Sequence, residues 1–168
     1  MSGSVDGMRM EFSEYVAARR PALVRTVVLL GCPQPDAEDV VQTALTKCLR
    51  HWRRVQRADR PEAYVHRVLV NTLADARKRR WNGELPTQTL PDAGHEADVT
   101  TGIAVRQALA AMDSGQREVL VLRYYADLSE REIADLLGIA PGTVKSRASR
   151  GLATLSANLT NLRSPDVS

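Results

Sequence analysis

One stretch near the carboxyl end, GIAPGTVKSRASR at residues 138–150, gathers basic and hydroxyl side chains in a short space. If Val144 and Ala148 point into a core, helical geometry turns the residues between them outward or to the flanks. Arginine and lysine can pair with guanine edges or phosphates, and serine and threonine with either. The pattern favours a helix that presents these groups to DNA over a solvated surface helix. The candidate contact residues are Thr143, Lys145, Ser146, Arg147 and Arg150.

The residues before this stretch predict the unit that would present it. Residues 129–132, Ser-Glu-Arg-Glu, form a capping-box pattern that opens a short helix, and Gly138 fits the position after its last turn. Pro141 suits the first turn of the next helix. Two short helices joined by a glycine-containing turn have the spacing of a helix-turn-helix. The expected inner stripe of the second helix is Val144, Ala148, Leu152 and Leu155.

A second basic surface is predicted in the first half of the chain. Residues 60–80 have a helical period, and the helix ends in four basic residues, which its dipole would favour in any case. The preceding segment RHWRRVQRADR adds five arginines. Basic clusters beside an aromatic ring can hold single-stranded nucleic acid, because charge follows the backbone while the ring stacks on a base. The outward residues are Tyr64, Arg67, Asn71, Asp75 and Lys78, opposite a core stripe of Val65, Val68, Leu69, Leu73 and Ala76.

Charge is distributed unevenly along the 168 residues, whose net charge is +3. Residues 1–82 carry 15 basic and 9 acidic groups, residues 83–100 carry none and 4, and residues 101–168 carry 8 and 7. The positive excess therefore lies in the first half, where a polyanion could neutralise it. No targeting signal or membrane-spanning run is evident, so we expect a cytoplasmic protein with no membrane contact of its own.

No residue pattern indicates catalysis or a cofactor. Motifs of the GxSxG, HExxH and P-loop types are absent from the sequence, and His51, His66 and His95 lie in different contexts. Cys32 and Cys48 lie on or beside apolar faces, so we expect buried thiols. Although Cys48 and His51 are three residues apart, no further cluster completes a tetrahedral metal site. We expect no enzyme activity, no cofactor and no metal.

These patterns predict an all-α fold of two small helical domains, residues 8–82 and 102–160, joined by a flexible linker at 83–101. The linker holds four acids, two prolines and two glycines and has almost no apolar period. In the first domain we expect Pro21 to divide the helix at 11–30. Asp36 is the predicted N-cap of a helix that runs to residue 55, and Asp59 with Glu62 a capping pair for the third. In the second domain the first helices are expected at 103–112 and 114–125.

Three segments together resemble a known family: AEDVVQTALTKCLRHWRRV, PEAYVHRVLVNTLADARKRR, and QREVLVLRYYADLSEREIADLLGIAPGTVKSRASRGLATL. They are similar to regions 2 and 4 of the extracytoplasmic-function (ECF) sigma factors, the smallest bacterial sigma class, and close to its sigma-E-like subgroup. The resemblance covers nearly all of residues 11–155 except the linker. It implies a promoter-specificity subunit of RNA polymerase, without catalysis of its own.

The resemblance also implies partners and contact residues. The partners are promoter DNA, the clamp of the largest polymerase subunit, the flap of the second largest, and an anti-sigma factor. Residues for the minus-35 element are those of the opening stretch. The residues for the minus-10 element are Arg57, Arg60, Tyr64, Arg67, Asn71 and Lys78. The residues for the polymerase are Asp39, Gln42, Thr46 and Arg50.

The sequence departs from the family at three places. Thr43 stands where an acid is usual, so one polymerase contact is expected to differ. Asp113-Ser114-Gly115 replaces a usual Leu-Pro, which leaves Ser114 as the expected helix cap. Ala140 replaces a serine or threonine cap, at a cost of about 1 kcal/mol unless Pro141 and packing compensate.

Two alternative functions stay open on the residues alone. One is an autonomous operator-binding regulator, which would bind a palindromic site tightly without polymerase. The other is a polymerase-binding protein that never contacts DNA. The linker length favours a polymerase-dependent reader. Promoter elements two turns apart lie roughly 70 Å from each other, whereas 18 residues reach about 60 Å when extended.

Overall fold

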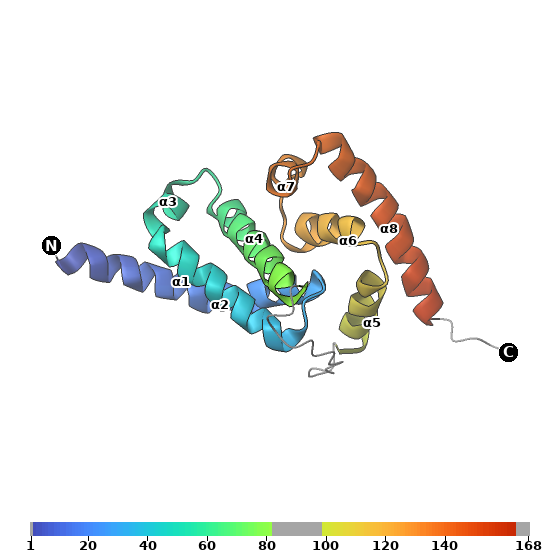
Figure 1. The fold of residues 1–168 in the computed structure, drawn as a ribbon, viewed down its shortest axis with the longest axis horizontal. Coiled ribbons are helices and arrows are strands. Elements are labelled where there is room, and N and C mark those ends of the chain that lie inside the picture. Colours follow the sequence, from blue (N-terminus) through green and yellow to red (C-terminus); the bar gives the residue numbers. More distant parts are fainter. Residues whose placement is uncertain (1, 82–98, 164–168) are drawn as a thin grey trace. The chain divides into compact units, whose positions relative to one another are not determined.

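The computed structural model describes residues 2–81 and 99–163, and every element in these ranges is helical. The all-α prediction is confirmed. Helices α1 to α4 belong to one compact body, unit 1, and α5 to α8 to a second, unit 2 (Figure 1). Residues 82–98, which make up most of the predicted linker, lie outside the described residues. Helix α5 begins at Val99, within the predicted linker, because the first turn of a helix needs no apolar side chain.

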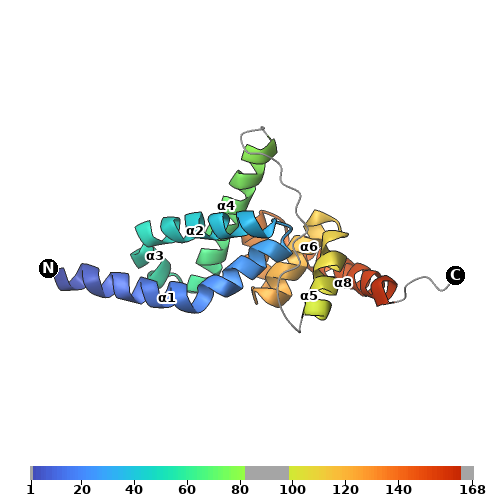
Figure 2. The ribbon, with the colours of Figure 1, turned by 90° about the horizontal axis from the view of Figure 1, so that it is seen from below.

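Unit 1 contains four helices, and its first is longer than expected. Pro21 lies inside α1 and does not divide it, so that prediction was wrong. A proline inside a helix removes one backbone hydrogen bond, and a bend can accommodate the loss. Figure 2 shows α1 bent along its length and continuous. The elements are α1 (Ser2–Leu29), α2 (Gln34–Arg50), α3 (Trp52–Arg57) and α4 (Pro61–Trp81).

The predicted helix at 36–55 is two helices. Helix α2 begins at Gln34 after Pro33, so Asp36 lies in the first turn and is not the N-cap. There it forms an ion pair with Arg80 at the end of α4. The chain leaves helical geometry at His51, where φ is −121°. The six apolar residues of the predicted stripe are nevertheless all buried: Val41, Ala44, Leu45, Cys48, Trp52 and Val55.

Helix α4 begins at Pro61, one residue after the expected start at Arg60, so the predicted capping pair at Asp59 is one residue out of register. Three of the five predicted core residues, Val65, Leu69 and Leu73, are buried, while Val68 and Ala76 are half-buried. His66 and Thr72 are buried in addition to them.

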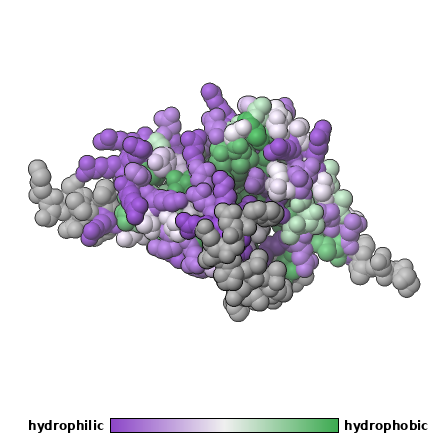
Figure 3. All heavy atoms as spheres, viewed as in Figure 1, coloured by the Kyte–Doolittle hydropathy of each residue, from purple (hydrophilic) through white to green (hydrophobic). Residues whose placement is uncertain are grey.

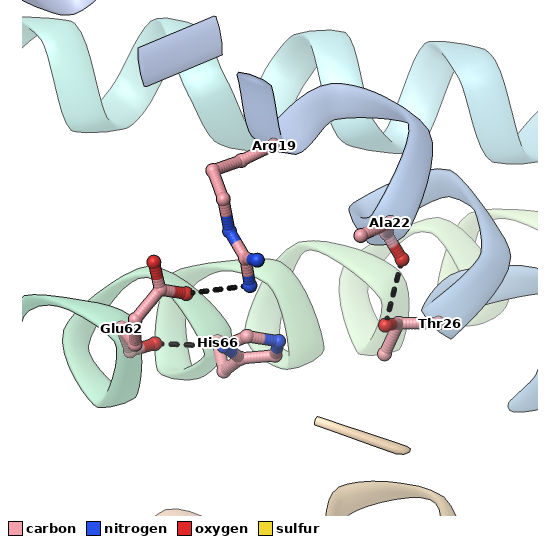
Figure 4. Close-up of polar contacts among 5 residues, drawn as sticks. All are labelled: Arg19, Ala22, Thr26, Glu62 and His66. Carbon is pink, nitrogen blue, oxygen red and sulfur yellow. Dashed lines mark hydrogen bonds and ion pairs between the residues drawn. The ribbon is translucent and has the colours of Figure 1, made fainter. Parts of the chain in front are cut away.

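Local hydrogen bonds explain how polar side chains enter this core. The Nδ1 atom of His66 lies 2.7 Å from the carbonyl oxygen of Glu62, and Thr72 donates to the Val68 carbonyl over 2.7 Å. Bonds of this kind, one turn back along the helix, remove most of the penalty for burying a polar group. Figure 4 shows the His66 contact together with an ion pair of 3.0 Å between Arg19 of α1 and Glu62 of α4.

An aromatic cluster joins α1 to α3. The ring of Trp52 lies 5.2 Å from that of Phe12, edge to face, and 5.4 Å from that of Tyr15. Such geometry stabilises aromatic pairs beyond the area they bury. Burial raises the pKa of the Tyr15 phenol above its ordinary value. The short helix α3 is therefore anchored by its tryptophan.

Unit 2 places five helical segments around a second core. Its first short helix after α5 is capped by Asp113, whose carboxylate accepts from the Gln116 amide over 3.3 Å, so the prediction that Ser114 is the cap was wrong. An aspartate one residue earlier leaves its side chain free to reach back to the helix amides. The elements are α5 (Val99–Ala110), α6 (Ser114–Leu120), the π-helix η1 (Val121–Tyr125), α7 (Glu130–Leu137) and α8 (Pro141–Arg163).

Candidate nucleic-acid interface

The turn before α8 is built as the sequence predicts. The Glu132 amide donates to Ser129 Oγ over 3.1 Å, and the Ser129 amide donates to Glu132 Oε1 over 3.3 Å, which completes the capping box of α7. Gly138 ends α7 with φ at +67°, a conformation that glycine adopts without strain. Pro141 is the first residue of α8. Helices α7 and α8 thus form the predicted pair with its glycine turn.

Helix α8 turns most of the predicted contact residues toward solvent. Lys145, Ser146 and Arg150 are exposed, and Thr143 is half-buried. The side chains of Lys145 and Arg150 form no hydrogen bond or ion pair within the described residues. Their cationic groups are therefore available to a partner.

Arg147 has a different environment from Arg150. It is half-buried, and its guanidinium lies against the first turn of α6: a Cβ atom built on Gly115 would lie 3.2 Å from Arg147 Nη1. The sequence alone gave no sign of this contact, because Gly115 and Arg147 lie in different helices. Of the five predicted residues on α8, Arg147 and Thr143 are half-buried and the other three are exposed.

The inner face of α8 follows the prediction for its first two turns only. Val144 and Ala148 are buried and Leu155 is half-buried, but Leu152 is 43% exposed, so its place in the stripe was predicted wrongly. Gly151 is buried instead, because the side chain of Leu120 lies over it. A large residue at position 151 would have been an obvious core candidate; a glycine was not.

The residues of α4 that were predicted for the minus-10 element lie on its outward face. Arg67, Asn71 and Lys78 are exposed, and Tyr64 is half-buried. These residues lie at helical spacings along one side of α4. Asp75 on the same face lies 4.0 Å from Lys47 of α2, which partly neutralises its charge. The face is therefore mainly cationic, with one ring and one amide.

A hollow beside α3 was not predicted. It measures about 410 Å³. Figure 3 shows mainly hydrophilic residues on the visible face of unit 1, which contains α3. The side chains of the four arginines that line the hollow form no hydrogen bond or ion pair within the described residues. Arginine forks suit phosphate oxygens, so the hollow can hold phosphate groups. Its lining is Leu49, Arg50, His51, Trp52, Arg53, Arg54 and Arg57.

The other two minus-10 candidates, Arg57 and Arg60, lie at the ends of the loop between α3 and α4. Both are exposed. Arg57 also lines the hollow, so the structure brings it together with the arginines of α3. The hollow, the loop and the α4 face make up what we call the unit 1 basic surface.

The predicted polymerase contacts lie on the exposed side of α2. Asp39, Thr46 and Arg50 are exposed at intervals of seven and four residues, which is one helix face. The Gln42 side-chain oxygen accepts from Arg20 Nη1 over 2.6 Å, so α1 occupies that acceptor. Arg20 was missed by sequence reasoning, because only the tertiary structure brings α1 beside α2.

Within the part of the chain that the structure describes, the cysteines and histidines form no metal site. Both cysteines are free and buried, as predicted, and burial raises the pKa of the Cys48 thiol to about 11. Within the described residues no group of three or more histidine, cysteine or acidic side chains could hold a metal ion. The described helices also include none with the length and hydropathy of a membrane span.

Comparison with known families places both units. Residues 15–83 match the family described as "Sigma-70 region 2", and residues 103–155 match the family described as "Sigma-70, region 4". The RNA polymerase sigma-E factor of Streptomyces coelicolor is 36% identical over 91% of this chain and 88% of its own length. The sigma-E factor of Streptomyces antibioticus is 38% identical, covering 91% and 87%. The ECF RNA polymerase sigma factor SigM of Mycobacterium tuberculosis is 32% identical, covering 92% and 80%.

Solved structures share the fold. The sigma factor RpoE of Bartonella quintana, solved with the anti-sigma factor NepR, superimposes with a TM-score of 0.73 at 23% identity, over 89% of this chain and 97% of that one. CnrH, solved with the cytosolic domain of CnrY, gives 0.63 at 26% identity, over 95% and 94%. Two matched regions, relatives above 30% identity along nearly the whole chain, and a shared fold lead to one conclusion. The chain belongs to the extracytoplasmic-function sigma factors of the sigma-70 family.

Proposed function

We propose that this chain binds core RNA polymerase and directs it to promoters, reading the minus-35 element with α8 and the minus-10 element with the unit 1 basic surface. The observation that carries this proposal is that each unit matching a sigma region exposes cationic side chains, Lys145 and Arg150 on α8 and Arg53, Arg54 and Arg57 on α3. The chain contributes binding and strand separation, while the polymerase performs the chemistry.

At the minus-35 element, α8 enters the major groove. Lys145 and Arg150 have free cationic groups on its exposed side, and Ser146 adds a hydroxyl that can donate or accept. A helix in the major groove can distinguish all four base pairs through such groups. Few charges are present, so this contact alone binds weakly and needs the polymerase to hold unit 2 at its element.

At the minus-10 element, the unit 1 basic surface holds one separated strand. The arginines of the hollow bind backbone phosphates, while the Tyr64 ring offers a stacking surface and the Asn71 amide a hydrogen-bonding group. Unstacking bases costs a few kcal/mol per step, so these contacts must offset that free energy for the strand to stay open. The proposed residues are Arg57, Arg60, Tyr64, Arg67, Asn71 and Lys78, with Arg53 and Arg54 added from the hollow.

The polymerase contacts are proposed on α2 and on unit 2. Asp39, Thr46 and Arg50 would meet the clamp of the largest subunit, and unit 2 the flap of the second largest. Because RpoE of Bartonella quintana was solved with an anti-sigma factor, we include such an inhibitor among the proposed partners of this chain.

Run-off transcription tests the proposal. Purified chain and core polymerase are incubated with a library of fragments from the source genome, and start sites are mapped. We expect a small set of start sites that share two sequence elements and that vanish when the chain is omitted. Tight binding to a palindrome without polymerase would instead support an autonomous regulator.

A matched pair of variants tests the minus-35 surface in the same assay. Arg150→Ala should lower specific transcripts by roughly tenfold, because it removes a free cation from the exposed face of α8. Arg131→Ala, which removes an exposed arginine of α7, is the control and should change little. Unchanged transcription by the Arg150 variant would indicate a protein that does not contact DNA through α8.

A further inference from the structure

Two glycines allow α6 and α8 to approach each other closely. A Cβ atom on Gly115 of α6 would lie 3.2 Å from Nη1 and 3.3 Å from Cζ of Arg147 on α8. A Cβ atom on Gly151 of α8 would lie 3.1 Å from both Cγ and Cδ1 of Leu120 on α6. On each helix, a glycine therefore lies against a side chain of the other helix. Contacts this short leave no room for a methyl group unless a neighbour moves.

The two contacts lie on one side of α8. Arg147 and Gly151 are four residues apart, hence one turn apart on the same face. Their counterparts lie at the two ends of α6, Gly115 near its start and Leu120 at its last residue. Two contacts separated along both helices restrict the rotation of α8 about its axis as well as its position.

The charge of Arg147 is also accommodated at this contact. The Oδ2 atom of Asp113 lies 3.2 Å from the same Cβ position on Gly115, so the carboxylate and the guanidinium are no more than twice that distance apart. They do not form a direct ion pair. The carboxylate nevertheless compensates for placing a cation beside a helix N-terminus, where the helix dipole is unfavourable to it.

We propose that Arg147 is a positioning residue: it docks α8 onto α6 through Gly115 and contacts neither bases nor phosphates. This inference rests on the proposed function of α8 as the reader of the minus-35 element. The rest of the exposed face can meet base edges only if α8 is held at one rotation, since a shift of about 1 Å misaligns its hydrogen bonds. The segment Asp113-Ser114-Gly115, which departs from the usual Leu-Pro, provides both the space for the guanidinium at Gly115 and the carboxylate of Asp113.

A DNA-independent test uses thermal unfolding of the full chain. Gly115→Ala should lower the melting temperature when Arg147 is present, because the methyl group displaces the guanidinium. In an Arg147→Ala background the same change should lower the melting temperature less, because only the Asp113 carboxylate then lies 3.2 Å from the methyl position and alanine favours helix over glycine. The difference between the two backgrounds measures the contact between Gly115 and Arg147. An equal effect in both backgrounds would overturn the proposal, whatever the chain does with DNA.

A second test uses the holoenzyme on fragments recovered by run-off mapping, at several salt concentrations. Arg147→Met keeps an unbranched apolar stem that can still pack beside Gly115, and it removes the guanidinium with all its side-chain hydrogen-bond donors. The affinity of this variant for the fragments should be within about threefold of the wild type, with the same dependence on salt concentration. Arg147→Ala should lower the affinity roughly tenfold on every fragment. Arg150→Ala is the contrast and should lower the salt slope or relax one base position.

The outcomes separate the two proposals. If Arg147→Met lowered the slope of log K against log salt concentration by about one, Arg147 would contact a phosphate, and the positioning role would be overturned. Lost discrimination at a single base pair would show a base contact and do the same. If the wild-type holoenzyme recovers no specific fragment, the proposed function fails, whereas the melting experiment still decides the packing role.

Discussion

The two units present their cationic groups in opposite ways. In unit 1, Arg53, Arg54 and Arg57 lie exposed on a six-residue helix, and one tryptophan anchors that short helix. In unit 2 the cations are few, and a capping box, a left-handed glycine and two close glycine contacts determine the position of the helix that carries them. Unit 1 therefore presents many cationic side chains whose orientation is weakly constrained. Unit 2 presents few, on a helix whose orientation is held by its neighbours.

This difference corresponds to the two proposed forms of DNA. A separated strand is flexible and presents phosphates at many angles, so a cluster of free arginines can bind it without strict geometry. Base pairs in a duplex present donors and acceptors at fixed positions, so the reading helix must itself be fixed. We infer that substitutions of charge will matter most in unit 1 and substitutions of packing most in unit 2.

The largest expected effect comes from removing the charge of the hollow. Arg53→Ala, Arg54→Ala and Arg57→Ala together should lower specific run-off transcripts by roughly a hundredfold, because three charged contacts are lost. The matched triple lysine variant should retain most activity if charge alone is needed. Equal losses for the alanine and lysine variants would contradict the contrast between the units.

A large effect on stability is expected in the unit 1 core. Leu69 is fully buried, so Leu69→Ala should lower the free energy of unfolding by about 2–5 kcal/mol. Hydrogen exchange should report the loss in α2 and α4, the helices that pack together there. Leu49→Ala, on an exposed residue of the hollow, is the control. Comparable losses for the two variants would mean that the burial pattern of unit 1 is incorrect.

Alkaline pH should weaken unit 1. Because burial raises the pKa of Cys48 from 9.0 to about 11, the folded state keeps a proton that the unfolded state releases. The contribution of this thiol to the free energy of unfolding is therefore present below pH 9. It is lost between pH 9 and 11, by up to about 3 kcal/mol. Urea unfolding at several pH values measures the fall. Cys48→Ala should reduce it, and an identical slope in the variant would exclude the thiol as its cause.

Acid should act on the same unit through His66. Burial lowers the pKa of this imidazole, so the unfolded state takes up a proton before the folded state does. Its contribution to stability is present above pH 6.5 and declines as the pH falls below that value. His66→Gln should flatten the dependence between pH 5 and 7. If the pH dependence of stability is unchanged in the variant, other groups cause it.

The smallest expected effects concern the helix caps of unit 2. Ser129→Ala removes the cap of α7 and should lower the free energy of unfolding by about 1 kcal/mol, and Asp113→Ala should have a similar effect through α6. Minus-35 binding should fall in both variants, because the caps hold the elements against which α8 packs. A binding loss without a stability loss would mean that these side chains contact the partner directly.

Much of each unit follows from short-range patterns in the sequence. The capping box at Ser129, the turn at Gly138 and the start of α8 at Pro141 were predicted correctly, because a few neighbouring residues specify each of them. The buried stripe of α2 and α3 was also predicted, since periodicity identifies the apolar face even where His51 interrupts the helix. Those features depend on residues one or two turns apart.

The roles that the sequence left undetermined depend on residues that are distant along the chain. Nothing near Arg147 distinguishes it from Arg150; only the approach of α6 separates a packed guanidinium from a free one. Gly151 replaces Leu152 in the core because Leu120, thirty-one positions earlier, occupies the space above Gly151. Local order is encoded by backbone propensity and period, whereas the choice between contact and exposure is made by steric fit between helices, which only the tertiary structure specifies.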